Sequence, residues 1–249
     1  MNRIWLSRLN VSLFWVIICA LTHNWFIMQA KKRKSYVVLM GDLVGSERAR
    51  SVRTVHRVFN KVIDSANKGY AAAIASPLTI TLGDEFQGLL STLAHAWHVA
   101  TELRLRLLIA NISCRFVIGM TELETPLNPK EAWNMMGGGL AAARDKLNDK
   151  RSSNAYRFSL PLEQIIESLL DAVGASLTQV ELGWTPTQLK YYSSVHLGSR
   201  TNAEIAKGLG VTQRSLYKVL HAARAEFHKR QSSTLQSALT ELDERYGMR

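Results

Sequence analysis

Two short stretches of the chain, residues 38–46 and 78–86, run through apolar and β-branched residues into a Gly-Asp pair. The acids are Asp42 in the first stretch and Asp84, followed by Glu85, in the second. Strands that end in carboxylates direct hard oxygen ligands at a divalent cation such as Mg²⁺ or Mn²⁺, which usually shares them with phosphate oxygens. If the two strand ends lie side by side, the acids converge on one cation. The pattern therefore predicts a metal-dependent nucleotide-phosphate site.

Each acid also has a structural explanation, and these alternatives stay open. Asp42 at the end of a strand would cap the helix that follows, and Asp84 with Glu85 would form a polar hairpin turn. His95 and His98 share a helical face, but the sequence offers no third ligand, so we predict that both are structural. No pairing of a nucleophile with a base stands out.

The elements that position these acids follow from apolar periodicity. The sequence predicts strands at 36–40, 71–75, 78–82, 86–90 and 115–120, a helix from Gly45-Ser46-Glu47 to Gly69, and helices at 92–109 and 140–147. The order β-α-β-β-α-β predicts a split βαβ arrangement, an α+β fold with helices on one face of an antiparallel sheet. The first strand and the hairpin would be central neighbours, so their acids would meet at one edge.

Beyond residue 160 the pattern is helical. A stripe at Leu162, Ile165, Ile166, Leu169, Leu170, Val173 and Leu177 predicts ordinary core or a dimer seam, so a homodimer stays open. Thr185-Pro186 is typical of a helix start. We expect further helices around the turn at 208–211, through 227, and at 235–246.

Charge is spread unevenly along the 249 residues, whose net charge is +11. Residues 184–249 carry ten basic and five acidic side chains, a distribution compatible with a nucleic-acid partner. The two cysteines, Cys19 and Cys114, lie at no metal-ligand spacing, so neither a disulfide framework nor a zinc site is indicated. A cytoplasmic location is the simplest interpretation.

The first 34 residues form a hydrophobic and basic leader with two interpretations. Val11–Leu21 and Trp25–Met28, followed by Lys31-Lys32-Arg33-Lys34, read as a marginal single membrane anchor with the body on the cytoplasmic side. Alternatively Met28 is the true start, and residues 1–27 are a misassigned extension. The membrane as a partner stays open.

Residues 201–220 resemble a helix-turn-helix of the kind found in sigma-factor region four. The turn lies at Gly208-Leu209-Gly210-Val211, and Thr212 caps the next helix. The resemblance implies a DNA-binding surface, with Gln213 and Arg214 suited to base edges and Tyr217 and Lys218 to phosphates. The alternative is a helical bundle for dimerisation or protein contact.

Residues 36–150 are similar to the class III nucleotide cyclases. Gly41–Ser46 resembles the Asp-Ile-x-Gly-Phe segment of that family, Thr81–Phe86 its Gly-Asp hairpin, and Ala142-Ala143-Arg144 its final helix. The Gly-Asp-Glu-Phe string also resembles diguanylate cyclases. The resemblance implies that Asp42, Asp84 and Glu85 hold the metal, that Gly45 and Ser46 offer amides to phosphate, and that Arg144 reaches the triphosphate.

Two departures from that family stand at positions that contact its substrate. Its base-reading Lys is Ile80 here, and the Asn of its last helix is Leu140, which cannot donate a hydrogen bond. Loss of one such donor typically costs two to three orders of magnitude in rate. The departures count against a cyclase reaction and leave metal and nucleotide binding in place, so whether the protein is an enzyme stays open.

The combination of such a front domain with a trailing helix-turn-helix resembles the bacterial SatD-like proteins, where Gly83–Gln87 has a counterpart. We therefore expect a ferredoxin-like (nucleotide cyclase/palm-like) α+β domain at 35–154, a connecting helix at 155–183 and an all-α helix-turn-helix domain at 184–249. The expected function is a cytoplasmic regulator that binds nucleotide, divalent metal and DNA. The alternative is a nucleotide-processing enzyme with a helical recruitment module.

Overall fold

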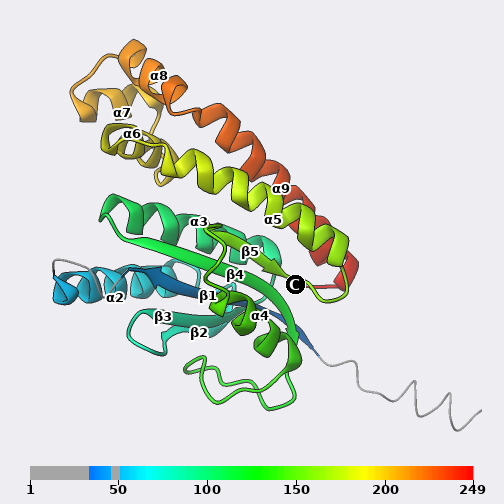
Figure 1. Ribbon diagram of the computed structural model, residues 1–249. Coiled ribbons are helices and arrows are strands. Elements are labelled where there is room, and N and C mark those ends of the chain that lie inside the picture. The colour runs from blue at the N-terminus through cyan, green and yellow to red at the C-terminus, as the bar shows by residue number, and fades with distance from the viewer. Residues whose placement is uncertain (1–33, 46–50, 249) are drawn as a thin grey trace, which may run out of the picture. The chain divides into compact units, whose positions relative to one another are not determined.

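The computed structural model describes residues 34–45 and 51–248, and the chain from Ser35 onward forms one compact unit. Figure 1 shows the elements, which in chain order are β1 (Ser35–Val44), α2 (Val52–Gly69), β2 (Ile74–Ile80), β3 (Glu85–Leu90), α3 (Leu93–Ile109), β4 (Ser113–Glu122), α4 (Gly138–Asn148), β5 (Tyr156–Ser159), α5 (Gln164–Leu182), α6 (Pro186–His196), α7 (Asn202–Leu209), α8 (Gln213–Ala222) and α9 (Ala225–Tyr246). The predicted leader, with its alternative interpretations as anchor or misassigned start, lies outside the described residues.

The strands of the described residues form one sheet in the order β2-β3-β1-β4-β5, with the first strand at its centre. Pairing is antiparallel except between β4 and β5, which run parallel. This mixed architecture confirms the predicted α+β class. The register places Asp42 opposite Glu85 on β3 and opposite Arg115 on β4.

The strand β5 lies where the sequence predicted the start of a connecting helix. Tyr156 and Phe158 point into the core shared with α3, and all four residues of β5 are buried. The helix α5 begins only at Gln164. Four residues are too few for a period-2 pattern to stand out, so the strand was not predicted. The division into domains at 154 and 183 stays a prediction.

The helices α2 and α3 pack on one face of the sheet as expected, whereas α4 covers the other face, which the sequence did not predict. Along β1, Val37 and Leu39 belong to the core with α2 and α3, whereas Val38 and Met40 belong to a second core with α4. Successive side chains of a strand point to opposite faces, so a strand buried throughout requires cover on both. We call the second side the α4 face.

The helix α2 begins at Val52, later than the predicted start at Gly45-Ser46-Glu47. The strand β1 continues to Val44, where it still pairs with β4, and Ser51 caps the helix by accepting a hydrogen bond from the Thr54 N–H. Ser46 lies outside the described residues. The predicted apolar face of α2 is confirmed, with Phe59 among its buried residues.

Pro77 lies inside β2 and does not separate two strands. The pairing of β2 with β3 shifts register on both sides of Ser76. The strand stands at the edge of the sheet, where proline is tolerated because one side of the strand needs no donor. The sequence had predicted separate strands at 71–75 and 78–82.

The rear helices pack onto the front core through α3, α5 and α9. Leu235, Leu239 and Leu242 of α9 belong to the same core as β1. The carboxylate of Asp243 accepts hydrogen bonds from the backbone N–H groups of Leu93 (2.7 Å) and Ala94 (2.9 Å), so α9 caps the start of α3.

The smaller helices α6, α7 and α8 enclose a separate cluster around Ile205, Ala206 and Leu216. Thr185 and Pro186 begin α6 as predicted, with a capping box between Thr185 and Gln188. Within residues 34–45 and 51–248, none of the helices has the length and apolar character needed to cross a membrane.

Candidate functional site

Asp42 is buried on the α4 face, where it forms an ion pair with Arg115 of the neighbouring strand. Both the Nη2 (2.7 Å) and the Nε (3.1 Å) of Arg115 donate to one carboxylate oxygen, Oδ2. Asp42 is only 4% exposed. The sequence did not predict Arg115 as a site residue, because only the strand register brings the two together. The guanidinium of Arg115 thus supplies the positive charge beside this carboxylate.

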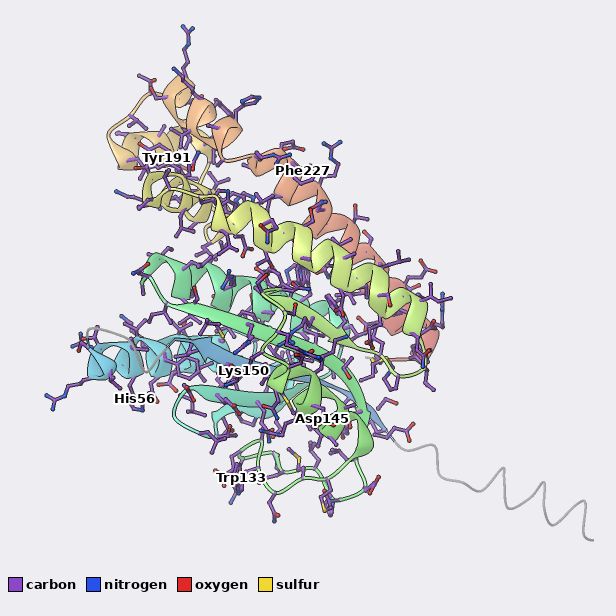
Figure 2. The ribbon with its side chains drawn as sticks, in the orientation of Figure 1. His56, Trp133, Asp145, Lys150, Tyr191 and Phe227 are labelled. Carbon is purple, nitrogen blue, oxygen red and sulfur yellow. The ribbon has the colours of Figure 1, made fainter. Side chains whose placement is uncertain are left out.

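Asp84 lies in the hairpin between β2 and β3. Its backbone oxygen accepts a hydrogen bond from the Leu43 N–H (3.0 Å). With Val55 and His56 of α2, Asp84 lines a small cavity on the opposite side of the sheet from the α4 face. Figure 2 labels His56 on α2. The structure therefore associates Asp84 with α2 and Asp42 with the α4 face.

Glu85, the third predicted metal ligand, pairs with Arg144 of α4 at 3.4 Å. The Nη2 of Arg144 also donates to the side-chain oxygen of Gln87 at 2.6 Å. The side-chain amide of Gln87 in turn donates to the backbone oxygen of Ala132. Arg144 therefore joins α4 to β3, and Gln87 extends this connection to the loop before α4.

The described residues do not fit the predicted cation well. Asp42 and Glu85 each pair with an arginine, and Asp84 lies with α2 residues. In the part of the chain that the structure describes, no group of three or more His, Cys, Asp or Glu side chains is arranged to hold a metal ion. Mg²⁺ or Mn²⁺ at these acids stays a prediction.

A cavity of 670 Å³ opens beside Arg144, between the β2–β3 hairpin, the start of α4 and the loop at 123–137. Its wall includes the well-exposed side chains of Leu82, Trp133 and Met136. Figure 2 shows Trp133 on the long loop on the α4 side of the sheet. Cavities of about 300–1,000 Å³ with apolar walls and few polar groups are typical of small-molecule sites. In the sequence, Trp133 lies close to Gly137-Gly138-Gly139. This was the signal for the cavity wall, and it was missed.

The glycines at the start of α4 differ in what they do. A Cβ on Gly137 would lie 2.4 Å from the backbone oxygen of Glu122, and one on Gly139 would lie 2.1 Å from that of Met120. Both glycines let α4 lie directly on β4. A Cβ on Gly138 would meet nothing within 4 Å, and Gly138 lines the cavity. Packing therefore does not explain this glycine.

No side chain caps the N-terminus of α4, which opens at this cavity. The first backbone N–H groups of a helix lack partners within the helix and favour an anion. With Arg144 alongside, the start of α4 combines two features that attract phosphate. Leu140 is largely buried in the core of the α4 face and also lines the cavity.

The other predicted phosphate residues lie elsewhere. Gly45 follows β1 with a positive φ of 72° and is exposed, and Ser46 lies outside the described residues. Because α2 begins only at Val52, Gly45 does not open that helix. The positive φ is a conformation that favours glycine, which explains Gly45 without a ligand.

The four predicted DNA-binding residues lie together on α8. Gln213, Arg214, Tyr217 and Lys218 are all exposed, whereas Leu216 of the same helix is fully buried. The helix follows a tight turn at Gly210, whose φ is 70°, and Thr212 caps it by accepting from the Ser215 N–H.

The segment of the chain that contains α8 is basic. Residues 200–230 contain seven Lys and Arg against two Glu. Such a distribution is compatible with a nucleic-acid partner.

A buried polar cluster, which no pattern in the sequence predicted, connects the sheet with the rear helices. Glu181 of α5 accepts hydrogen bonds from Arg104 (2.8 Å) and Tyr156 (2.7 Å), and lies 3.2 Å from His228 of α9. Burial alone would raise the pKa of Glu181, but His228 and Arg104 hold it below its ordinary value. Burial and the neighbouring carboxylate raise the pKa of Tyr156. Tyr192 of α6 joins this cluster through its hydroxyl group, which lies 2.6 Å from the Nδ1 of His228.

Comparison with known proteins gives a family and weak structural likenesses. The model of the SatD family matches residues 36–239. Two structures of a bacterial light-regulated adenylyl cyclase align with TM-scores of 0.35 and 0.36 at 11% identity, covering 64% of this chain. The chain spans 58% of the length of those structures. The comparison with curated proteins found no match.

Proposed function

The chain belongs to the SatD family, and we propose that it is a regulatory protein that binds a nucleotide in the cavity beside α4 and DNA through α7 and α8. The observation that carries the nucleotide half is the meeting of Arg144, the uncapped start of α4 and the open Gly138 at one cavity. Arg144 and the helix amides bind phosphate, and Trp133 offers an aromatic face to the base.

We further propose that the front domain is ferredoxin-like and related to the nucleotide cyclases. The strand order β2-β3-β1-β4 with all pairs antiparallel supports this, as does the order of α2 and α3 between the strands. Leu140 in the core argues for ligand binding without a cyclase reaction. In this proposal the positive charge at the cavity comes from Arg144, with or without a divalent cation carried by the nucleotide.

For DNA we propose that α7 and α8 form a helix-turn-helix. The support is the tight turn at Gly210, the buried contact of Leu216 with Ile205, and the exposed basic face of α8. Gln213 and Arg214, at the start of α8, would face base edges, and Lys218 would contact a phosphate.

The nucleotide half is tested by titrating ATP, GTP and their cyclic and diphosphate forms into the full chain, by calorimetry, with either Mg²⁺ or a chelator. We expect a binding isotherm that Arg144→Gln weakens at least tenfold. Arg151→Gln, a change of an exposed arginine away from the cavity, is the matched control. No binding by any nucleotide would refute this half.

Two further readouts of the same titration separate the alternatives. Binding that persists in chelator supports the metal-free site, and binding only with Mg²⁺ or Mn²⁺ would restore the predicted metal at Asp42, Asp84 and Glu85. Chromatography of the mixture for turned-over nucleotide decides between the sensor and the nucleotide-processing enzyme.

The DNA half is tested by gel shift with sheared genomic DNA over a series of salt concentrations. We expect affinity to fall steeply with salt, and Lys218→Ala, which removes the proposed phosphate contact, to weaken binding and flatten the salt dependence. Arg53→Ala, an exposed arginine on α2, is the control. A shift that is absent, or one that both variants weaken equally, would refute DNA binding through α8.

A further inference from the structure

Glu124 is the one acid among the described residues that line the cavity beside α4. Its backbone N–H donates to the Met136 oxygen (2.8 Å), and the Met136 N–H donates to the hydroxyl of Thr125 (2.9 Å), so the two ends of the loop meet beside the cavity. Asp42 and Glu85 each pair with an arginine, but in the part of the chain that the structure describes the Glu124 carboxylate has no such partner. This carboxylate is therefore available to a ligand with N–H donors.

The loop that carries this acid is fixed to the strand β2 at two further points. The Ser76 hydroxyl donates to the Asn128 backbone oxygen (2.6 Å), and the Ala132 N–H donates to the Thr79 hydroxyl (2.8 Å). Ser76 is fully buried, so the first of these contacts is shielded from water. The cavity wall is thus formed before a ligand arrives, and a preformed wall lowers the cost of ordering the site on binding.

Asn134 adds a hydrogen-bond donor to the same wall. It lines the cavity, and its backbone has a positive φ of 56°, a conformation that asparagine tolerates better than most residues. Its side-chain amide carries two N–H groups and one acceptor oxygen, whereas the carboxylate of Glu124 only accepts. Together the two side chains present a pair of acceptor oxygens and a donor to a ligand.

The base whose edge complements this set is guanine. Two adjacent N–H groups suit a carboxylate best, because each oxygen then accepts one hydrogen bond. Guanine has such a pair at N1 and the 2-amino group, with the acceptor O6 beside them. Adenine and cytosine place an unprotonated ring nitrogen next to their amino group, and a carboxylate repels its lone pair. Uracil offers a single N–H between two carbonyl oxygens.

We propose that the cavity selects guanine nucleotides, whose N1 and 2-amino groups donate to Glu124 and whose O6 accepts from the amide of Asn134. This inference rests on the proposed nucleotide site and names its base. The two charged side chains of the cavity wall give the ligand its direction, since Arg144 attracts the phosphate groups and Glu124 repels them. Trp133 of the same loop offers a ring on which the base stacks.

The first test compares the two purines in matched pairs by calorimetry with the full chain and Mg²⁺: GTP with ATP, GDP with ADP, and cyclic GMP with cyclic AMP. We expect the guanine member to bind about tenfold more tightly or better, as for a base edge held by two hydrogen bonds. An adenine member that binds as tightly as its guanine counterpart would overturn the guanine selectivity and leave the nucleotide site in place. Binding by none of the six would overturn both.

The second test changes the carboxylate. Glu124→Gln replaces one acceptor oxygen with an N–H group, which suits the ring nitrogen of adenine, so the preference for guanine should fall about tenfold. Thermal melting should stay as in wild type, because the side chain is exposed. Glu131→Gln, an exposed acid of the same loop that does not line the cavity, is the matched control. A preference that Glu124→Gln leaves unchanged, or that Glu131→Gln lowers as far, would overturn the inference.

Inosine nucleotides isolate the second hydrogen bond. ITP, IDP and cyclic IMP keep the N1 proton and O6 of guanine but lack its 2-amino group. We expect them to bind wild type more weakly than their guanine counterparts, and this difference should shrink in Glu124→Gln because the paired acceptor is gone. Equal binding of guanine and inosine nucleotides by wild type would overturn the contact between the 2-amino group and Glu124.

Discussion

Arg115 holds the carboxylate of Asp42 from the neighbouring strand and donates to it twice at a buried position. The acid with the strongest resemblance to a metal ligand is thereby neutralised by a side chain of the same sheet. Guanidinium suits this place because its planar fork matches a carboxylate and its charge persists at all ordinary pH values. At the residue scale, the α4 face presents arginines and no excess of acids.

Removing this arginine should destabilise the fold. Arg115→Met leaves a buried carboxylate without its partner, which we expect to lower the free energy of unfolding by about 3–5 kcal/mol. The measurement is urea denaturation followed by circular dichroism. Adding Asp42→Asn to the variant should recover part of the loss, since the uncompensated charge is then gone. If Arg115→Met alone changes nothing, the ion pair does not form.

Glu181 provides a prediction about pH. Glu181→Gln leaves Arg104 buried without a charged partner, so we expect a loss of about 3 kcal/mol in unfolding free energy at pH 7. The folded pKa of Glu181 lies below its ordinary 4.5, so its stabilisation is present above that pH and is lost as the pH falls through the folded pKa. Urea titrations should therefore show the two proteins converging below about pH 4.5. Glu241→Gln, exposed on α9, should behave as wild type.

At the element scale, two glycines at the start of α4 have different roles, one in packing and one in ligand binding. Gly139→Ala puts a Cβ 2.1 Å from the Met120 oxygen, so we expect a clear fall in melting temperature. Gly138→Ala meets open space and gains helix propensity of up to about 1 kcal/mol, so stability should hold or rise.

At Gly138 the same substitution should lower the affinity for nucleotide, although it leaves stability unchanged or raises it. A methyl group there enters the cavity beside the helix amides, and Gly138→Val should weaken binding further than Gly138→Ala. Calorimetry and thermal melting of the same samples measure both effects. If Gly138→Val binds nucleotide as tightly as wild type, the ligand does not approach the start of α4.

The strands and helices that were predicted well are those with long, regular patterns. The apolar run of β1 and the stripe of α2 are visible in the sequence, and so is the capping pair Thr185-Pro186. The strand β5 is too short to show an alternation of side chains between the two faces. The strand β1 is buried on both faces, so α4 is needed to cover the second one. Which face a helix covers depends on contacts between distant residues, which local patterns do not encode.

The candidate site was predictable only in part, for the same reason. Arg144 was named from its motif and lines the cavity, whereas Arg115 and Trp133 were missed. The strand register brings Arg115 to Asp42, and the path of the loop brings Trp133 to α4. Gln213, Arg214, Tyr217 and Lys218 were easier to place, because their exposure follows from the period of a single amphipathic helix.

At the scale of the whole molecule, one core joins the front sheet to α5 and α9. Residues of β1, α2, α3, β5, α5 and α9 belong to the same cluster. The cluster of α7 and α8 is separate and contains only a few fully buried side chains. The α4 face has a further core of its own, around Val38, Met40 and Val117.

Hydrogen exchange should show this division directly. We expect α3, α5 and the second half of α9 to be protected as strongly as the sheet, and α7 and α8 to exchange at a lower opening free energy, because small clusters open locally. Asp243→Ala removes the cap that α9 gives to α3, so protection should fall at the start of α3 and the end of α9 together. Glu241→Ala on the same helix is the control. If α9 exchanges with α7 and α8 in the wild type, the rear helices form a unit of their own and the front core does not extend into them.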